Sequence, residues 1–142
     1  LRRRRRWRPY MRARDYLKLL SPEQQKVLKK QLKPLAEKKV RFDEDGFSLK
    51  LESKIGNVDL GPFNIDVYRH YFSVEMNSDR GGFAHPHIEY GEPCLGNFYY
   101  LMKEAWLAAD YLDLIDLVQK FLNSYDRYNC FCGLDEALNC ED

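Results

Sequence analysis

The sequence lacks several features that define large protein classes. No stretch approaches the roughly 20 apolar residues of a membrane-spanning helix, so we expect no membrane partner. It also has no glycine-rich phosphate-binding loop, no HExxH zinc motif and no Ser/His/Asp arrangement. These absences favour a protein without a bound cofactor. They also point away from nucleotide hydrolysis, metalloprotease and serine hydrolase chemistry.

The four cysteines are irregularly spaced. Four cysteines could form two disulfides, but Cys130 and Cys132 are too close in sequence for easy mutual pairing, and Cys94 has no evident mate. The segment Arg2–Arg6 is followed by no apolar stretch of the kind found in signal peptides. We therefore expect reduced thiols and a cytoplasmic protein.

The small net charge of +1 conceals a strong asymmetry. Residues 1–14 contain no acid and eight arginines, namely Arg2, Arg3, Arg4, Arg5, Arg6, Arg8, Arg12 and Arg14. Residues 15–142 hold 15 Lys+Arg against 22 Asp+Glu, a formal charge of −7. Arginines interleaved with Trp7 and Tyr10 predict an arm that contacts an acidic partner such as nucleic acid. The alternative is a solvated tail or the end of a larger protein.

Helix signals dominate the region before residue 40. A chain of 142 residues is long enough for one hydrophobic core and short for two. Ser21-Pro22-Glu23-Gln24 has the pattern of a capping box with proline at the first helical position, and Pro34 should end or kink that helix. Residues 10–20 could extend the arm as a short helix with Tyr16 on its apolar side.

Strand signals follow in the middle of the chain. Apolar and polar residues alternate, as in strands with one buried face, over Phe47–Leu51, Phe63–Val67 and Phe72–Met76, and Val40–Phe42 is a further short strand candidate. Asp45-Gly46 is a turn dipeptide that predicts a hairpin between Val40–Phe42 and Phe47–Leu51. Four consecutive strands indicate an antiparallel meander with one buried and one polar face.

Helical periodicity returns after residue 97. Asn97 is a candidate cap for a helix, and a second apolar pattern follows from Leu114 to Leu122, as one bent helix or as a pair broken near Ala109. These helices would cover the sheet and complete an α+β fold with an N-terminal helix, a four-stranded antiparallel meander and C-terminal helices. We predict an Arg-rich arm over 1–20, a domain over 21–125 and a Cys-containing tail over 126–142.

Candidate chemistry is concentrated in residues 85–97, between the strands and the final helices. Two histidines, two prolines, two glycines and one cysteine occur there. Prolines restrict the backbone and glycines permit tight turns, so the segment is expected to form a rigid exposed loop that presents Cys94. A thiol held against backbone donors is a candidate nucleophile, although free cysteines are also commonly buried and inert.

The same residues resemble a known family. His85-Pro86, a short spacer, Gly91, two residues and then Cys94-Leu95 are similar to the active-site segment of E2 ubiquitin-conjugating enzymes. The His-Pro-His and Cys-Leu-Gly-Asn forms look like the prokaryotic and phage E2-like relatives. The resemblance implies a UBC or RWD-type fold and extends, in element order, over about residues 20–125.

In that family the cysteine carries a ubiquitin-like modifier as a thioester, and this role would fall on Cys94. His87 stands where the eukaryotic enzymes have an asparagine that helps the oxyanion, and His85 is a candidate acid, base or structural pin for the loop. The resemblance implies a conjugating transferase whose partners are a modifier and an activating enzyme. A non-catalytic E2-like scaffold is the alternative, for example a structural protein of a phage virion anchored to its assembly through the arm.

A metal site is a further hypothesis. His85 and His87 together with Cys130, Cys132 and Cys140 supply imidazole and thiolate ligands that suit zinc. Their spacing matches no zinc finger or ribbon, and the tail after Asn129 would have to fold back beside the loop. We therefore assign no metal ligands from the sequence.

Overall fold

Four β-strands form an antiparallel sheet in the order β1-β2-β3-β4 in the computed structural model, which describes residues 9–140. The strands are β1 (Arg41–Asp43), β2 (Gly46–Ile55), β3 (Val58–Tyr68) and β4 (Ser73–Asn77). Neighbours in sequence are neighbours in the sheet, so the predicted four-stranded meander and the α+β class are confirmed. The two-residue turn Gly56–Asn57 joins β2 to β3 and makes this hairpin longer than the alternation indicated.

The sheet has one apolar and one polar face, as the period of two along each strand requires. The buried face is formed by Phe47, Leu49, Phe63, Ile65, Val67, Val74 and Met76. Cross-strand pairs such as Phe47 with Val67 and Val67 with Val74 align these side chains. Polar residues that occupy the alternate positions, including Ser48, Lys50 and Asn64, face away from the core. A slip of one residue would reverse both faces, so burial sets the register.

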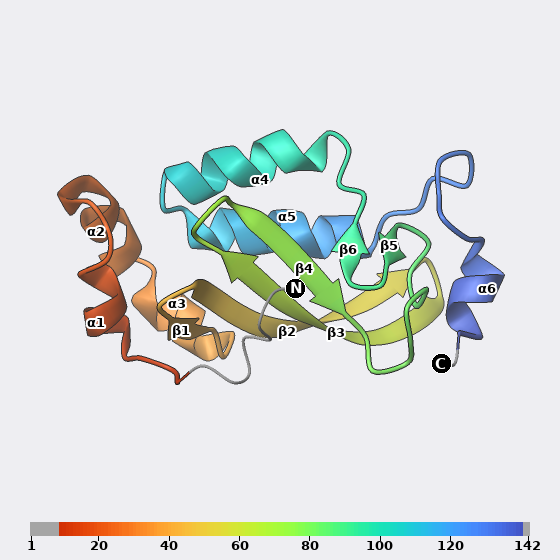
Figure 1. Cartoon of the computed structure of the whole chain (residues 1–142), viewed down its shortest axis with the longest axis horizontal. Helices are drawn as coiled ribbons and strands as arrows, with labels where there is room; N and C mark the ends of the chain where they lie inside the picture. Colours follow the sequence, from red (N-terminus) through yellow and green to blue (C-terminus); the bar gives the residue numbers. More distant parts are fainter. Residues whose placement is uncertain (1–8, 141–142) are drawn as a thin grey trace.

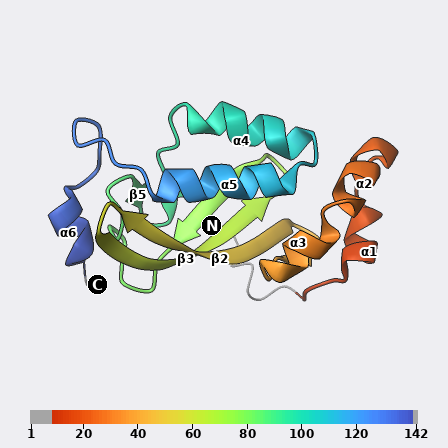
Figure 2. The same cartoon turned by 180° about the vertical axis from the view of Figure 1, so that it is seen from behind.

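Two C-terminal helices, α4 (Phe98–Leu107) and α5 (Tyr111–Leu122), lie against the sheet (Figures 1 and 2). The sequence left open whether they form one bent helix or a pair, and the structure shows a pair. Ala109 adopts a positive φ of 56°, which ends the first helix, and the Asp110 side chain accepts a hydrogen bond from the Asp113 amide at 3.2 Å. Such a side-chain cap is typical of a helix start.

An aromatic cluster joins these helices to the sheet. The rings of Trp106 and Tyr111 are stacked with centroids 5.1 Å apart, and Phe47 of β2 stacks on Tyr111 at 4.8 Å. The Tyr111 hydroxyl lies 2.7 Å from that of Tyr16, so the one polar group of each ring is satisfied. This cluster is the part of the core in which the N-terminal helices, the sheet and both C-terminal helices meet.

Three short helices lie at the β1 end of the sheet, namely α1 (Ala13–Leu17), α2 (Pro22–Lys29) and α3 (Leu32–Glu37) (Figure 1). Ser21 and Gln24 form the predicted capping box, with hydrogen bonds of 3.2 and 3.3 Å. Pro34 lies inside α3 rather than at the end of α2. Because proline has no amide hydrogen, the Lys30 carbonyl loses its helical donor, and the helix breaks there.

Gln31 lies between α2 and α3 and joins this junction to the C-terminal helices. Its side-chain amide nitrogen donates to the Ala109 carbonyl at 2.8 Å, and its side-chain oxygen accepts from the Leu112 amide at 3.0 Å. Both bonds satisfy main-chain groups that the helix ends leave without a helical partner.

The packed structure extends beyond the predicted domain limits of 21 and 125. Tyr16, assigned from the sequence to the arm, has no exposed surface, because its ring fills the aromatic cluster. At the other end of the chain, α6 (Leu134–Leu138) packs on β3 with Ala137 buried, although these residues were expected to form a tail. In neither case does the sequence carry a long apolar pattern. Over residues 9–140, no helix combines the length and apolar character needed to cross a membrane.

Candidate functional site

The loop that carries the candidate residues begins with Arg80, a residue that no sequence pattern marks. Its guanidinium donates to the main-chain carbonyls of Leu60 at 3.1 Å, Ala84 at 2.9 Å and Leu138 at 2.7 Å. These acceptors belong to β3, the loop and α6. One side chain therefore fixes where the loop leaves the sheet, and only knowledge of its distant partners could have identified it.

His85 belongs to this loop, but it is buried in the core. The ring has no exposed surface, and its Nδ1 accepts the His87 amide at 3.1 Å, so Nε2 carries the hydrogen donated to the Leu122 carbonyl at 2.8 Å. The ring stacks on Phe121 with centroids 5.7 Å apart. Burial, more than any charge, lowers the pKa of His85 from 6.5 to about 4; the Leu122 hydrogen bond opposes the shift and His87 adds to it. His85 is therefore neutral at pH 7 and connects the loop to the end of α5.

His87 is also largely buried. Its Nε2 accepts a hydrogen bond from the Asp126 amide at 2.9 Å, and its own carbonyl accepts the Cys94 amide at 2.9 Å. Burial lowers its pKa, while the Asp126 charge and a main-chain hydrogen bond at Asn129 oppose that shift. His87 thus holds the cysteine segment through its backbone and the C-terminal segment through its ring.

A small hairpin presents the cysteine. Its strands are β5 (Ile88–Glu89) and β6 (Glu92–Pro93), and both turn residues, Tyr90 and Gly91, have positive φ angles of 47° and 81°. Positive φ at both positions is typical of a tight type I′ turn. The Gly91 carbonyl accepts the Met76 amide at 2.8 Å, and the Tyr90 ring lies where a Cβ on Gly82 would stand. Both glycines allow the hairpin to approach its neighbours closely.

Cys94 follows β6 directly and is exposed. Its amide is bonded to His87, and the chain then passes through Gly96, with a φ of 54°, into α4. Asn97 occupies the N-terminal flank of α4, but its side chain makes no capping hydrogen bond, contrary to expectation. The thiol is therefore open to a large reactant, while the backbone that carries it is attached to the core.

The imidazoles do not surround this thiol. His85 points into the core toward α5 and His87 toward Asp126, so the structure separates two of the three predicted catalytic residues from the third. Of the predicted binding arginines, Arg2–Arg6 and Arg8 lie outside the described residues. Arg12 and Arg14 are exposed at the start of α1.

The C-terminal segment lies beside the loop, as the zinc hypothesis required. The Phe131 amide donates to the Pro86 carbonyl at 2.8 Å, and the Cys132 thiol lies 3.8 Å from the Phe83 carbonyl. Burial, followed by the proximity of Glu136, Cys130 and Cys140, raises the pKa of Cys132. All four cysteines are free, and within residues 9–140 no three His, Cys, Asp or Glu side chains are grouped closely enough to hold a metal ion.

Comparison with protein-family models, with curated proteins and with solved structures gave no match to this chain.

Gly91 has no room for a side chain in the hairpin. A Cβ there would stand 2.2 Å from Asn77 Oδ1, in addition to the strain of a φ of +81°. Gly91→Ala should therefore lower the free energy of unfolding by more than the roughly 1–2 kcal/mol of left-handed strain alone.

Gly56→Ala is the matched control, because Gly56 has a φ of +61° and open space around its Cβ position. Urea denaturation of both variants would separate strain from collision. Equal losses in the two variants would show that the Asn77 side chain moves aside freely, which would contradict this prediction.

Proposed function

We propose that this chain is an E2-like protein of the UBC type that carries a ubiquitin-like modifier on Cys94 as a thioester. The observation that supports this most directly is an exposed thiol on a backbone anchored to the core. The order of elements agrees with the proposal, since helices, a four-stranded meander, a cysteine loop and then two helices follow one another. The motif from His85 to Leu95 supplies the family resemblance.

The proposed reaction is an exchange of thioesters. The Cys94 thiolate attacks the carbonyl carbon at the C-terminus of the modifier, which the activating enzyme holds as a thioester. A new S–C bond forms, the activating enzyme's thiolate leaves, and the proton lost by Cys94 balances the one that this thiolate takes up. An acceptor amine later attacks the same carbon and releases Cys94. An exposed thiol suits both steps, because each requires a second protein to reach the sulfur.

His85 and His87 act in this proposal as positioning residues. Their rings bond to main-chain groups of other segments, and the His87 carbonyl holds the Cys94 amide. Neither ring is assigned a proton transfer at the sulfur. The buried, neutral state of His85 fits such a role, because a charged imidazole could not accept the His87 amide at Nδ1.

The test measures thioester exchange at each cysteine. The full chain is incubated with a peptide that ends in Gly-Gly and is activated as an aryl thioester, and adducts are mapped by mass spectrometry without reductant. We expect an adduct on Cys94 that excess dithiothreitol cleaves by thiol exchange, and that Cys94→Ser abolishes or converts to an ester that resists the thiol. Cys130→Ser and Cys132→Ser are controls and should leave it unchanged. An adduct that persists unchanged in Cys94→Ser would contradict the proposal.

A second candidate is a non-catalytic E2-like scaffold that serves an assembly such as a virion, anchored through the Arg-rich arm. It is favoured by the engagement of both histidines with the main chain, which leaves neither as a base for the thiol. The same experiment separates the two candidates. Failure of Cys94 to exchange faster than Cys130, despite its greater exposure, would support the scaffold.

A further inference from the structure

We propose that the helical region at the β1 end of the sheet is a binding surface for single-stranded nucleic acid. We call residues 12–41 the basic lobe; it contains α1, α2, α3 and the start of β1. Ten of its side chains are basic and all ten are exposed: Arg12, Arg14, Lys18, Lys26, Lys29, Lys30, Lys33, Lys38, Lys39 and Arg41. Its only acids are Asp15, Glu23 and Glu37, so it carries a formal charge of +7.

The rest of the described chain has the opposite sign. Residues 42–140 contain 7 Lys+Arg and 17 Asp+Glu, a formal charge of −10. Figure 1 shows the three helices of the basic lobe together at one end of the molecule, away from α6. Such a separation of charge creates a field that attracts a polyanion to one end and repels it from the other. The amino-acid composition, with a net charge near zero, conceals this property.

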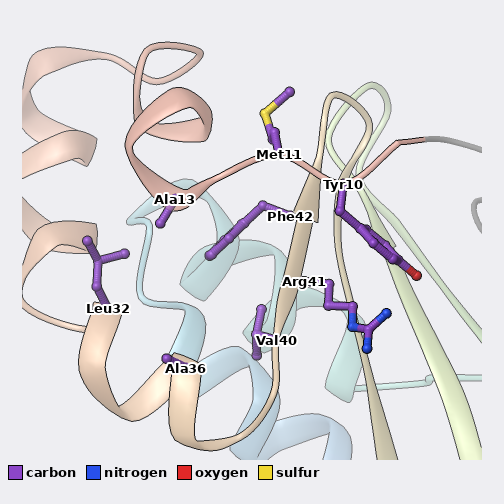
Figure 3. A pocket seen from close by; sticks show the side chains of 8 residues that line it. All are labelled: Tyr10, Met11, Ala13, Leu32, Ala36, Val40, Arg41 and Phe42. Atoms are coloured by element: carbon purple, nitrogen blue, oxygen red, sulfur yellow. The ribbon is translucent and has the colours of Figure 1, made fainter.

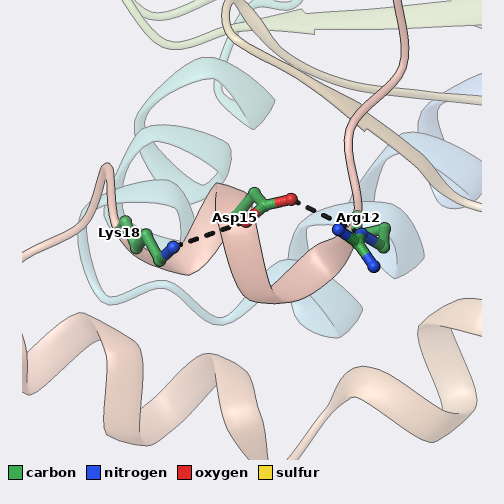
Figure 4. Close-up of polar contacts among 3 residues, drawn as sticks. All are labelled: Arg12, Asp15 and Lys18. Atoms are coloured by element: carbon green, nitrogen blue, oxygen red, sulfur yellow. Dashed lines mark ion pairs between the residues drawn. The ribbon is translucent and has the colours of Figure 1, made fainter.

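The acids of the lobe neutralise little of this charge. Asp15 lies 3.6 Å from Arg12 and 3.5 Å from Lys18, and both basic side chains remain largely exposed (Figure 4). Two exposed cations that share one carboxylate retain a net positive charge. Exposed ion pairs of this kind also contribute little binding energy, so a phosphate can replace the carboxylate at low cost.

An aromatic platform accompanies the charge. A crevice of about 300 Å³ lies among α1, α3 and β1 and is lined by apolar side chains such as Met11, Leu32 and Phe42 (Figure 3). Tyr10 and Arg41 also line it, and the Arg41 guanidinium lies over the Tyr10 ring, 4.9 Å from its centroid. The Tyr10 side chain is 48% exposed. A half-exposed tyrosine beside an arginine can stack an unpaired base, which is why the surface fits a single strand.

This inference does not depend on the thioester proposal, because the basic lobe contains no part of the Cys94 loop. Lysines would hold the phosphates and the Tyr10–Arg41 pair would stack a base. A duplex offers the phosphates but no unstacked base, and an anionic membrane offers charge without a base. Binding of duplex nucleic acid or of an anionic membrane can therefore be distinguished from binding of a single strand.

The test is a titration of fluorescein-labelled dT20 with the full chain, followed by fluorescence anisotropy between 50 and 300 mM NaCl. The triple variant Lys26→Gln, Lys29→Gln, Lys33→Gln is compared with Lys54→Gln, Lys103→Gln, Lys120→Gln. Both variants remove three exposed lysines, but only the first removes them from the basic lobe. We expect the first to weaken binding at least about tenfold at 100 mM salt. It should also reduce the slope of log K against log salt by up to about 2, since each phosphate contact contributes about 0.7.

Tyr10→Ala tests the stacking platform, with Tyr100→Ala as its control, since Tyr100 is exposed on α4. We expect Tyr10→Ala to weaken dT20 binding about tenfold without changing the salt slope. Equal affinity of the two triple variants for dT20 would overturn the proposal. So would equal binding of dT20 and its duplex with dA20, or tighter binding to phosphatidylserine vesicles than to dT20. Circular dichroism confirms that each variant is folded.

Discussion

Replacing Phe47 with alanine is expected to lower the free energy of unfolding by about 3–5 kcal/mol. Phe47 has no exposed surface and stacks on Tyr111 at 4.8 Å and on Trp106 at 6.2 Å. Its loss would leave a cavity where β2 meets α4 and α5, and neighbouring rings cannot close it without giving up their own stacking. Urea denaturation followed by circular dichroism measures the effect.

Tyr100→Ala is the control, because Tyr100 is 74% exposed on α4 and its replacement should change stability by no more than about 0.5 kcal/mol. Phe47→Leu should cost less than Phe47→Ala, since part of the volume is kept. A loss of under about 1 kcal/mol for Phe47→Ala would show that the aromatic cluster is not the centre of the core.

The second large effect is a loss of stability on acidification caused by His85. Its pKa is lowered from 6.5 to about 4 in the folded protein, so the unfolded chain binds a proton more readily between these values. Folding stability due to this residue is therefore complete above pH 6.5 and falls as the pH drops toward 4. The slope is about 1.4 kcal/mol per pH unit for one proton, which amounts to roughly 3 kcal/mol over the whole interval.

The contribution of His85 is isolated by comparing variants at several pH values. His85→Gln should be less stable than the wild type at pH 7, because two buried hydrogen bonds are disturbed, but its stability should fall less steeply from pH 6.5 to 4. His70→Gln is the control, since it replaces a histidine that is exposed rather than buried. Parallel curves for His85→Gln and the wild type would contradict the assignment. His87 adds to the slope in the same direction, because burial lowers its pKa as well.

The sequence by itself determined the type and order of the main elements. The alternation in Phe47–Leu51 and Phe63–Val67 indicated strands with one buried face, and the Ser21–Gln24 pattern marked the start of α2. These signals are local, because the period of an element and its cap depend on residues within a few positions of one another. The proline and glycine content of residues 85–97 likewise predicted an exposed loop. This is confirmed for Cys94, but residues 85–88 are buried because the loop folds against the core.

Only the tertiary structure decided the roles of the residues around that loop. His85 was expected as either a catalytic group or a pin, and its bond to Leu122, 37 residues away, places it in the core. Arg80 and Gln31 gave no sequence signal, although each joins segments far apart in the chain. Tyr16 was placed in a short helix that extends the arm, and only its packing in the aromatic cluster shows that it belongs to the core. Partners, burial and pKa depend on which distant segments come together, and a pattern within one segment carries no information about them.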